Sequence, residues 1–248
     1  YLDSCLRALR LGGFLALTAT DTATLCGVNP KACLRRYGAK PLKTEYCHEL
    51  AVRILIGAAV RLAARRDLAL KPLFTHATDH YVRVYLQMVR GAKRADEALS
   101  RLGYLYHCPN CLARQPLEGL LPHTPPKCGE CGFPMEAAGP LWLGGLWHPE
   151  IVEAMLVELS KAEVGRFREA SNLLSKVKLE MNVESVGYYT VDRLAEVYHR
   201  TPLSPSRLAE ALSGEGFKAS PTHFNPQGVR TEAPISVVKK IFLQGLKC

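Results

Sequence analysis

The chain has 248 residues, 48% of them hydrophobic, which is enough apolar material for one large domain or about two to three small ones and excludes a disordered protein. It contains neither a run of about 18 apolar residues nor a signal-peptide pattern, so we predict a soluble, cytoplasmic protein without a membrane partner. The formal net charge of +9 favours a polyanionic partner, most simply a nucleic acid.

The amino-terminal residues have the pattern of an α/β protein. Residues 1–10 show helical spacing, a glycine pair follows, and residues 14–21 form a short apolar run that predicts a buried strand. This order predicts one unit of a parallel sheet. Ligands bind at the carboxyl ends of such strands, so Thr20 and Asp21 are candidate pocket residues. Asp21 could equally serve only as a helix cap.

The irregular segment that follows carries a cluster of candidate RNA-binding residues. Arg35, Arg36 and Tyr37 could contact a phosphate or stack on a base, or they could simply be solvated in a loop.

A long apolar helix and a β-hairpin are predicted next. Residues 47–66 are apolar around most of a helical circumference, which predicts a buried helix. Its Glu49 and Arg53 stand four positions apart and are interpreted as an ordinary helix pair. Two β-type runs within residues 72–90 predict a hairpin that completes the sheet with an antiparallel edge.

Four cysteines form two C-x-x-C pairs, Cys108 with Cys111 and Cys128 with Cys131. Each pair can hold one side of a tetrahedral ion, so together they predict a closed, structural Zn²⁺ site. An iron site with the same ligands, a disulfide pair or unrelated core cysteines are the alternatives. The nearby His107 and His123 could be spare ligands, but four thiolates already saturate zinc. The other five cysteines lack the spacing of a disulfide framework, which fits a reducing compartment.

Residues 139–150 contain two tryptophans in a glycine-rich stretch, which predicts a packed strap between modules or, alternatively, an exposed platform for stacking bases. Residues 149–182 are helical in pattern. Near the carboxyl end, Thr190 and Ser204 are predicted helix caps. A hairpin and a final basic helix follow. Two short helices before a hairpin are typical of a winged helix, which binds nucleic acid or protein.

Several of these stretches, in this order, resemble the tRNA (guanine-N2)-dimethyltransferases. They are ALTATDTATLCG, C-x-R-R-Y-G, EYCHE, DHYVRV, the double C-x-x-C motif, GPLWLGGLW and ASPTHFNPQGVRTEAP. The resemblance implies methylation of the exocyclic amine of guanine 26 in tRNA, with S-adenosylmethionine as the donor. It also implies a Rossmann-type catalytic domain joined to a carboxy-terminal domain peculiar to the family.

One departure from the family pattern concerns catalysis. The glycine-rich cofactor loop, the acidic ribose-binding residue and the D-P-F-G motif, whose aspartate would accept the amine hydrogens, are absent from this sequence. In the family, D-P-F-G directly precedes a segment like residues 1–10. We therefore expect this chain to be the downstream part of a longer enzyme, to contain no catalytic residue, to need the missing amino-terminal half as its partner, and to be inactive alone.

The resemblance and the pattern together predict three parts. Residues 1–92 would be the carboxy-terminal half of the methyltransferase sheet, residues 93–145 a zinc module, and residues 146–248 a helical, winged-helix-like domain that binds tRNA. In that domain Lys218, His223 and Arg230 would line the hairpin and suit backbone phosphates. The alternative function is a zinc-ribbon and winged-helix protein that binds nucleic acid without catalysis.

Overall fold

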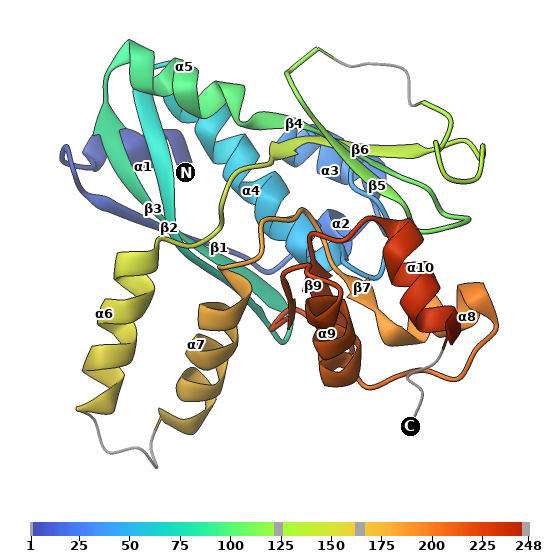
Figure 1. The fold of residues 1–248 in the computed structure, drawn as a ribbon. Coiled ribbons are helices and arrows are strands. Elements are labelled where there is room, and N and C mark those ends of the chain that lie inside the picture. The colour runs from blue at the N-terminus through green and yellow to red at the C-terminus, as the bar shows by residue number, and fades with distance from the viewer. Residues whose placement is uncertain (1, 122–125, 162–166, 245–248) are drawn as a thin grey trace.

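The strands that the structure describes form three separate sheets. The computed structural model describes residues 2–121, 126–161 and 167–244. Within these ranges each sheet has three strands, and every strand pairing is antiparallel. Figure 1 shows the long central helix α4 running between the first two sheets, with the carboxy-terminal elements gathered below the second sheet. The sheets therefore belong to an α/β fold whose parts share one central helix.

The first sheet has the order β1-β3-β2, with β1 at Phe14–Ala19, β2 at Leu68–Thr78 and β3 at Tyr81–Arg90. The predicted hairpin is confirmed, but β3 lies in the middle of the described sheet and not at its edge. The prediction that β1 is part of a parallel sheet is likewise wrong for the described strands, because β1 pairs with β3 in antiparallel register. Since β3 is antiparallel to both outer strands, β1 and β2 run in the same direction without touching.

The prediction that β1 is fully buried is also wrong. Leu15 and Ala19 are buried, whereas Phe14, Ala16 and Thr18 are exposed. Successive side chains of a strand point to opposite faces, so this pattern means that only one face of β1 is covered.

In the described part of the chain, five helices accompany the first sheet. α1 precedes β1, and the predicted long buried helix is confirmed as α4, which packs against β2 and also against β6 of the second sheet. Gly57 permits this second contact, since a Cβ there would lie 3.2 Å from the Cα of Leu141. The bounds of the helices are Leu2–Ala8 for α1, Thr22–Leu25 for α2, Pro30–Tyr37 for α3, Cys47–Ala64 for α4 and Ala92–Ser100 for α5.

The second sheet has the order β5-β4-β6 and carries the cysteine pairs in its loops. Its strands are β4 at Leu102–His107, β5 at Arg114–Glu118 and β6 at Glu136–Trp142. The strap after β6 is packed and not an exposed platform. Trp142 is only 7% exposed, and the Trp147 indole donates to the carbonyl of Thr75 at 2.9 Å.

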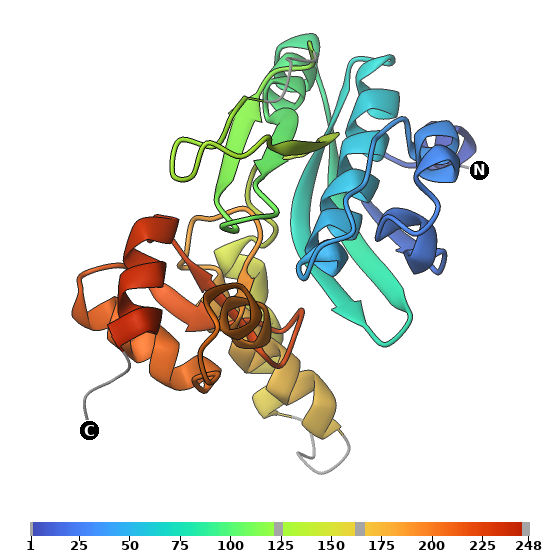
Figure 2. The ribbon, with the colours of Figure 1, turned by 90° about the vertical axis from the view of Figure 1, so that its right-hand side faces the viewer.

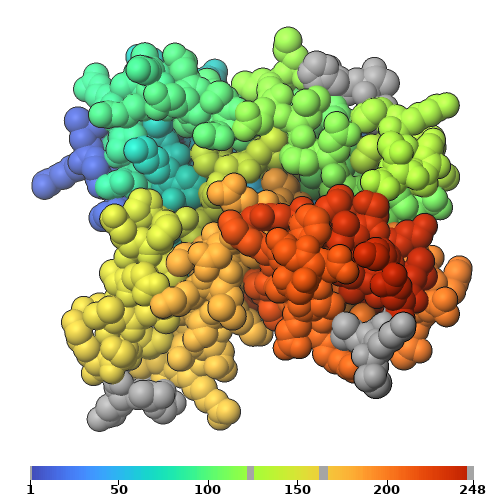
Figure 3. All heavy atoms as spheres, viewed as in Figure 1, coloured from blue at the N-terminus to red at the C-terminus, as the bar shows by residue number. Residues whose placement is uncertain are grey.

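Two helices form a separate lobe. α6 at Pro149–Ser160 and α7 at Arg168–Glu180 pack against each other and, through Val152, Leu174 and Val177, against Phe74 of β2. In the space-filling view this yellow-to-gold lobe projects beside the orange-to-red carboxy-terminal part (Figure 3).

The carboxy-terminal elements follow the predicted order of two capped helices, a hairpin and a helix. The hydroxyls of Thr190 and Ser204 accept from the backbone amides of Arg193 and Arg207, so both predicted caps are confirmed. Figure 2 shows these elements packed below the second sheet. The elements are β7 at Tyr189–Thr190, α8 at Val191–Tyr198, α9 at Pro205–Gly214, β8 at Ala219–Pro221, β9 at Gly228–Thr231 and α10 at Ile235–Gln244.

Candidate functional site

The carboxyl ends of β1 and β2 lie at the same edge of the first sheet. Ala19 at the end of β1 pairs with Val82, next to the β2–β3 turn, and the Thr22 hydroxyl donates to the carbonyl of His80 in that turn at 3.5 Å. The segment containing Thr20 and Asp21 therefore borders the turn between β2 and β3. Thr20 itself is exposed.

Asp21 is the centre of a small polar cluster. It occupies the N-cap position of α2, but its carboxylate makes no capping hydrogen bond. It accepts instead from the Tyr37 hydroxyl at 2.5 Å and from Nη1 of Arg36 at 3.0 Å. Burial and the bond to this carboxylate raise the pKa of Tyr37. Asp21, a predicted pocket residue, thus meets Arg36 and Tyr37, two of the predicted RNA-binding residues. The third, Arg35, is exposed on α3.

A cavity of about 710 Å³ opens at the same edge of the sheet, between the β2–β3 turn, α7 and the loop after β8. Burial, followed by electrostatic interactions with His223 and Arg83, lowers the pKa of His76 in its wall to about 4. The cavity is also lined by the imidazoles of His48, His76 and His223, the ammonium of Lys176, and the carboxylates of Asp79 and Glu169.

Two of the three predicted phosphate-binding residues do not project from the hairpin. Arg230 is 1% exposed, so the prediction that it meets a backbone phosphate is wrong. The His223 side chain is 2% exposed and its Nδ1 lies 2.6 Å from Oε1 of Glu180, so it too is turned inward, into the wall of the cavity. Lys218 is exposed as predicted. Arg230 is turned inward because all residues of β9, Gly228–Thr231, are buried.

A buried ionic network joins α4, α7 and β9. Arg230 donates to Glu49 at 2.7 Å and, at 3.4 Å, to Glu180, while Arg53 donates to Glu49 at 2.8 Å. Two carboxylates therefore balance two guanidinium groups in the interior. The interpretation of Glu49 and Arg53 as an ordinary helix pair is wrong, because their side chains are 0% and 3% exposed.

Sequence reasoning missed this network, although one signal was present. α4 is apolar around most of its circumference, and a charge on such a helix must find an interior partner. Nothing local in the sequence identified Arg230 as that partner, because the two residues are 181 positions apart.

The four cysteines come together at the loops of the second sheet. The Sγ atoms of Cys108 and Cys131, and those of Cys111 and Cys128, are 3.5 Å apart, and all four lie within 4.8 Å of one another. Sulfur atoms around a tetrahedral zinc ion are separated by about 3.8 Å, given Zn–S bonds of about 2.3 Å. The cluster could therefore hold a metal ion. His107 lies buried against the Tyr46 ring and is outside this ligand set, and His123 lies outside the described residues.

Each cysteine pair sits in a tight turn. The amide of Leu112 donates to the carbonyl of Cys108, and that of Gly132 to the carbonyl of Cys128. Both residues have positive φ, 65° and 72°. Such turns point backbone amides at sulfur, and the pKa of Cys131 is lowered to about 6 by the Asn110 side chain and the Phe133 amide.

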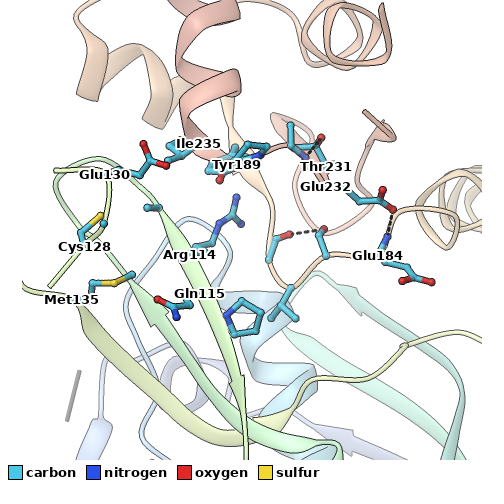
Figure 4. Close-up of a pocket in the computed structure, with 18 residues that line it drawn as sticks. Arg114, Gln115, Cys128, Glu130, Met135, Glu184, Tyr189, Thr231, Glu232 and Ile235 are labelled. Atoms are coloured by element: carbon cyan, nitrogen blue, oxygen red, sulfur yellow. Dashed lines mark hydrogen bonds between the residues drawn. The ribbon is translucent and has the colours of Figure 1, made fainter. Parts of the chain in front are cut away.

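A second, smaller pocket lies between the cysteine loops and the carboxy-terminal part (Figure 4). The guanidinium of Arg114 points from β5 into this space of about 420 Å³, 3.6 Å from the centre of the Tyr189 ring. Three carboxylates also line it, from Glu130, Glu184 and Glu232. Carboxylates repel phosphate, which disfavours this pocket as a contact for RNA.

Comparison with known proteins agrees with this architecture. The family profile described as N2,N2-dimethylguanosine tRNA methyltransferase matches residues 1–243. A tRNA (guanine(26)-N(2))-dimethyltransferase of Methanobrevibacter smithii is 37% identical over 241 residues, which cover 97% of this chain and 62% of the relative. A tRNA (guanine(26)-N(2)/guanine(27)-N(2))-dimethyltransferase of Aquifex aeolicus is 35% identical, with 97% and 60% covered.

A solved structure matches this chain over the same share of its length as these relatives do. Trm1 from Pyrococcus horikoshii, determined in complex with S-adenosyl-L-methionine, superposes with a TM-score of 0.88 at 34% identity, over 97% of this chain and 62% of that one. The chain thus spans about three fifths of the length of these relatives. Among the described residues, no helix is long and apolar enough to cross a membrane. The match over residues 1–243 shows that the chain belongs to the N2,N2-dimethylguanosine tRNA methyltransferase family.

Proposed function

We propose that this chain is part of an enzyme that transfers methyl groups from S-adenosylmethionine to N2 of guanine 26 in tRNA. The observation that carries the proposal is family membership over residues 1–243, together with a fold that matches an S-adenosylmethionine complex at a TM-score of 0.88.

The first sheet supports a Rossmann-type arrangement for residues 1–92. β1 and β2 run in the same direction, α4 covers one face, and the loops after both strands meet at one edge. In open α/β sheets ligands bind at the carboxyl ends of such strands. We place the reaction at this edge, and we retain residues 93–145 as the zinc module and 146–248 as the winged-helix-like, tRNA-binding part.

The described residues do not form a complete site for S-adenosylmethionine. The sequence has no G-x-G-x-x-G loop, and the carboxylate of Asp21 already accepts from Arg36 and Tyr37. The role of Asp21 in our proposal is to hold the segment after β1 against α3, so that Thr20 borders the space that the substrate base enters. Precise placement is what the reaction needs, since a misplaced base loses most of the benefit of alignment.

The tRNA would approach over the cavity at the same edge. A guanine inside a folded tRNA must leave its stack to be methylated, at a cost of a few kcal/mol. Contacts to neighbouring phosphates can offset that cost. We propose Lys176 in the cavity wall, together with the exposed Lys218 and Arg35, as such contacts.

The four cysteines fit Zn²⁺ in number, donor type and spacing. Zinc bound by Cys108, Cys111, Cys128 and Cys131 would have no open position, so its contribution is structural. It would fix the loops that pack on the carboxy-terminal helices. The Tyr198 hydroxyl of α8 donates to the carbonyl of Cys111 at 3.0 Å, which ties the two parts together.

The proposal can be tested by exchanging segments with a relative. In the Methanobrevibacter smithii protein, the matched residues would be replaced by this chain, and methyl incorporation from labelled S-adenosylmethionine into tRNA would be measured. We expect N2-methylated guanosine in tRNA that has guanine 26 and none in tRNA that has adenine there. Methylation that is independent of guanine 26 would contradict the proposal.

A second candidate function is nucleic-acid binding without catalysis. The observation that favours it is the order of capped helices and hairpin next to a four-cysteine cluster, which also occurs in binding modules. This candidate predicts a folded chimera that binds nucleic acid, with duplex DNA preferred to tRNA, and transfers no methyl group.

A further inference from the structure

A second group of metal-ligand side chains lies apart from the four-cysteine cluster. Cys26 is the C-cap of α2, and Cys47 and His48 are the first two residues of α4. Their two Sγ atoms and one imidazole nitrogen all lie within 4.8 Å of one another. Two thiolates and an imidazole are a donor set that zinc prefers and that magnesium and calcium do not.

The backbone holds these donors in place before any ion arrives. α2 packs against α4, and the amide of Cys26 donates to the carbonyl of Thr22 at 2.7 Å. The next residue, Gly27, has φ of +90°, and a Cβ there would lie 2.7 Å from the amide nitrogen of Lys43. The segment carrying Cys26 is therefore pressed against the chain that enters α4. A preformed site loses less conformational entropy when it binds its ion.

One side of the group is open. Cys47 and His48 are only partly buried, and His48 lines the cavity of about 710 Å³. Three protein ligands leave the fourth tetrahedral position of a zinc ion free for water or for an oxygen of a bound molecule. The four-cysteine cluster has no such position.

We propose that Cys26, Cys47 and His48 bind a second zinc ion, with one exchangeable position directed towards the cavity. Binding displaces one proton from each thiol, and the neutral imidazole supplies its lone pair, so the charges of the ion and the two thiolates cancel. The ion would clamp α2, and with it the segment of Thr20 and Asp21, onto the amino-terminal end of α4. The inference rests on the donor geometry and not on the proposed methyl transfer.

Metal content tests the proposal directly on the purified chain. After loading with zinc and dialysis, elemental analysis should give about two zinc ions per chain, one for each ligand set. Cys26→Ser and His48→Gln should each lower this to about one. Cys33→Ser is the matched control, because Cys33 is a fully buried thiol on the adjacent α3 that lies outside the group, and it should retain about two.

Cobalt substitution tests the open position without any variant. In the cobalt-loaded chain, added thiocyanate should alter the visible d–d bands of one ion, because a three-ligand site can take a fourth ligand and a saturated tetrathiolate site cannot. His48→Gln should remove that response.

Three results would overturn the inference. The first is a wild-type chain that holds about one zinc ion. The second is a His48→Gln variant that keeps about two zinc ions while its circular dichroism is unchanged. Alternatively, the zinc-loaded chain could contain a Cys26–Cys47 disulfide by mass spectrometry. If Cys26→Ser unfolds, the wild-type cobalt response decides the question, and its absence would overturn the proposal.

Discussion

Arg230 on β9 donates to Glu49 on α4 at 2.7 Å, although the two residues are 181 positions apart and their side chains are 1% and 0% exposed. The pair connects the carboxy-terminal hairpin to the central helix of the fold. It is completed by Glu180 of α7 and Arg53 of α4, so that four charges from three segments neutralise one another in the interior. The four charges thus couple the carboxy-terminal part of the chain to the first sheet.

Removing the cation at the centre of this network should be costly. Arg230→Met keeps much of the volume but leaves Glu49 and Glu180 short of a partner, and breaking a buried pair in this way costs about 3–5 kcal/mol. Urea unfolding followed by circular dichroism would measure the loss.

The control is Lys218→Met on the same hairpin, where the side chain is exposed and the expected change is within about 0.5 kcal/mol. The double variant Glu180→Gln with Arg230→Met should be more stable than Arg230→Met alone, because Glu180 loses its guanidinium partner whereas Glu49 keeps Arg53. Equal stability of Arg230→Met and the wild type would show that the network contributes nothing.

Stability should fall in acid through Glu49. Burial is the largest influence and acts to raise the pKa of this carboxyl, but Arg230 and Arg53 together outweigh it and hold the pKa at about 2. The folded pKa is thus below the unfolded value of about 4.3. The unfolded state binds the proton first, so this contribution is complete above about pH 4.5 and is lost as the pH falls towards 2, amounting to about 3 kcal/mol.

The unfolding free energy of the wild type and of Glu49→Gln should therefore be compared between pH 7 and pH 3. The difference between them should shrink as the pH falls below about 4.5, because glutamine does not titrate. A difference that stays constant over this range would contradict the assigned pKa.

Loss of one cysteine of the proposed zinc site should loosen the second sheet. Cys128→Ser removes one of the four thiols, and structural zinc sites contribute on the order of 10 kcal/mol of coupled folding energy. We expect faster amide exchange in β4, β5 and α8, since the Tyr198 hydroxyl is bonded to the Cys111 carbonyl. Hydrogen exchange read by mass spectrometry measures this.

Cys5→Ser serves as the control, because Cys5 is exposed and belongs to no ligand group among the described residues. A chelator should reproduce the effect of Cys128→Ser in the wild type. Unchanged exchange in β4 and β5 after complete zinc removal would show that the ion has no folding role.

Binding of tRNA should weaken steeply with salt, because phosphate contacts release counterions. Removing one such contact with Lys218→Ala should reduce the slope of log K against log salt by about one. Filter binding of the chain to tRNA over a range of about 50 to 200 mM salt would give the slopes. Lys161→Ala is the matched comparison, because both lysines are exposed and ion-paired, Lys218 with Glu232 and Lys161 with Glu158, but only Lys218 is a proposed tRNA contact. An affinity that does not change with salt would contradict nucleic-acid binding.

The sequence alone located most helices and strands because local chemistry specifies them. The caps at Thr190 and Ser204 need only a hydroxyl before a helical run, and the hairpin of β2 and β3 needs only two alternating runs and a turn. The spacing of the four cysteines likewise predicts a shared site, because each pair occupies a single turn.

Tertiary structure decided the rest, where residues distant in sequence meet. Which strand lies in the middle of the first sheet depends on pairing between β1 and β3, which are separated by a long helix. Whether Arg230 faces solvent or a carboxylate depends on what covers the hairpin. The grouping of Cys26 with Cys47 and His48 depends on how α2 packs on α4. Local patterns set which residues are helical, extended or ligand-like. The burial of a side chain and the choice of its partner follow from the packing of whole elements, and no short stretch of sequence contains that information.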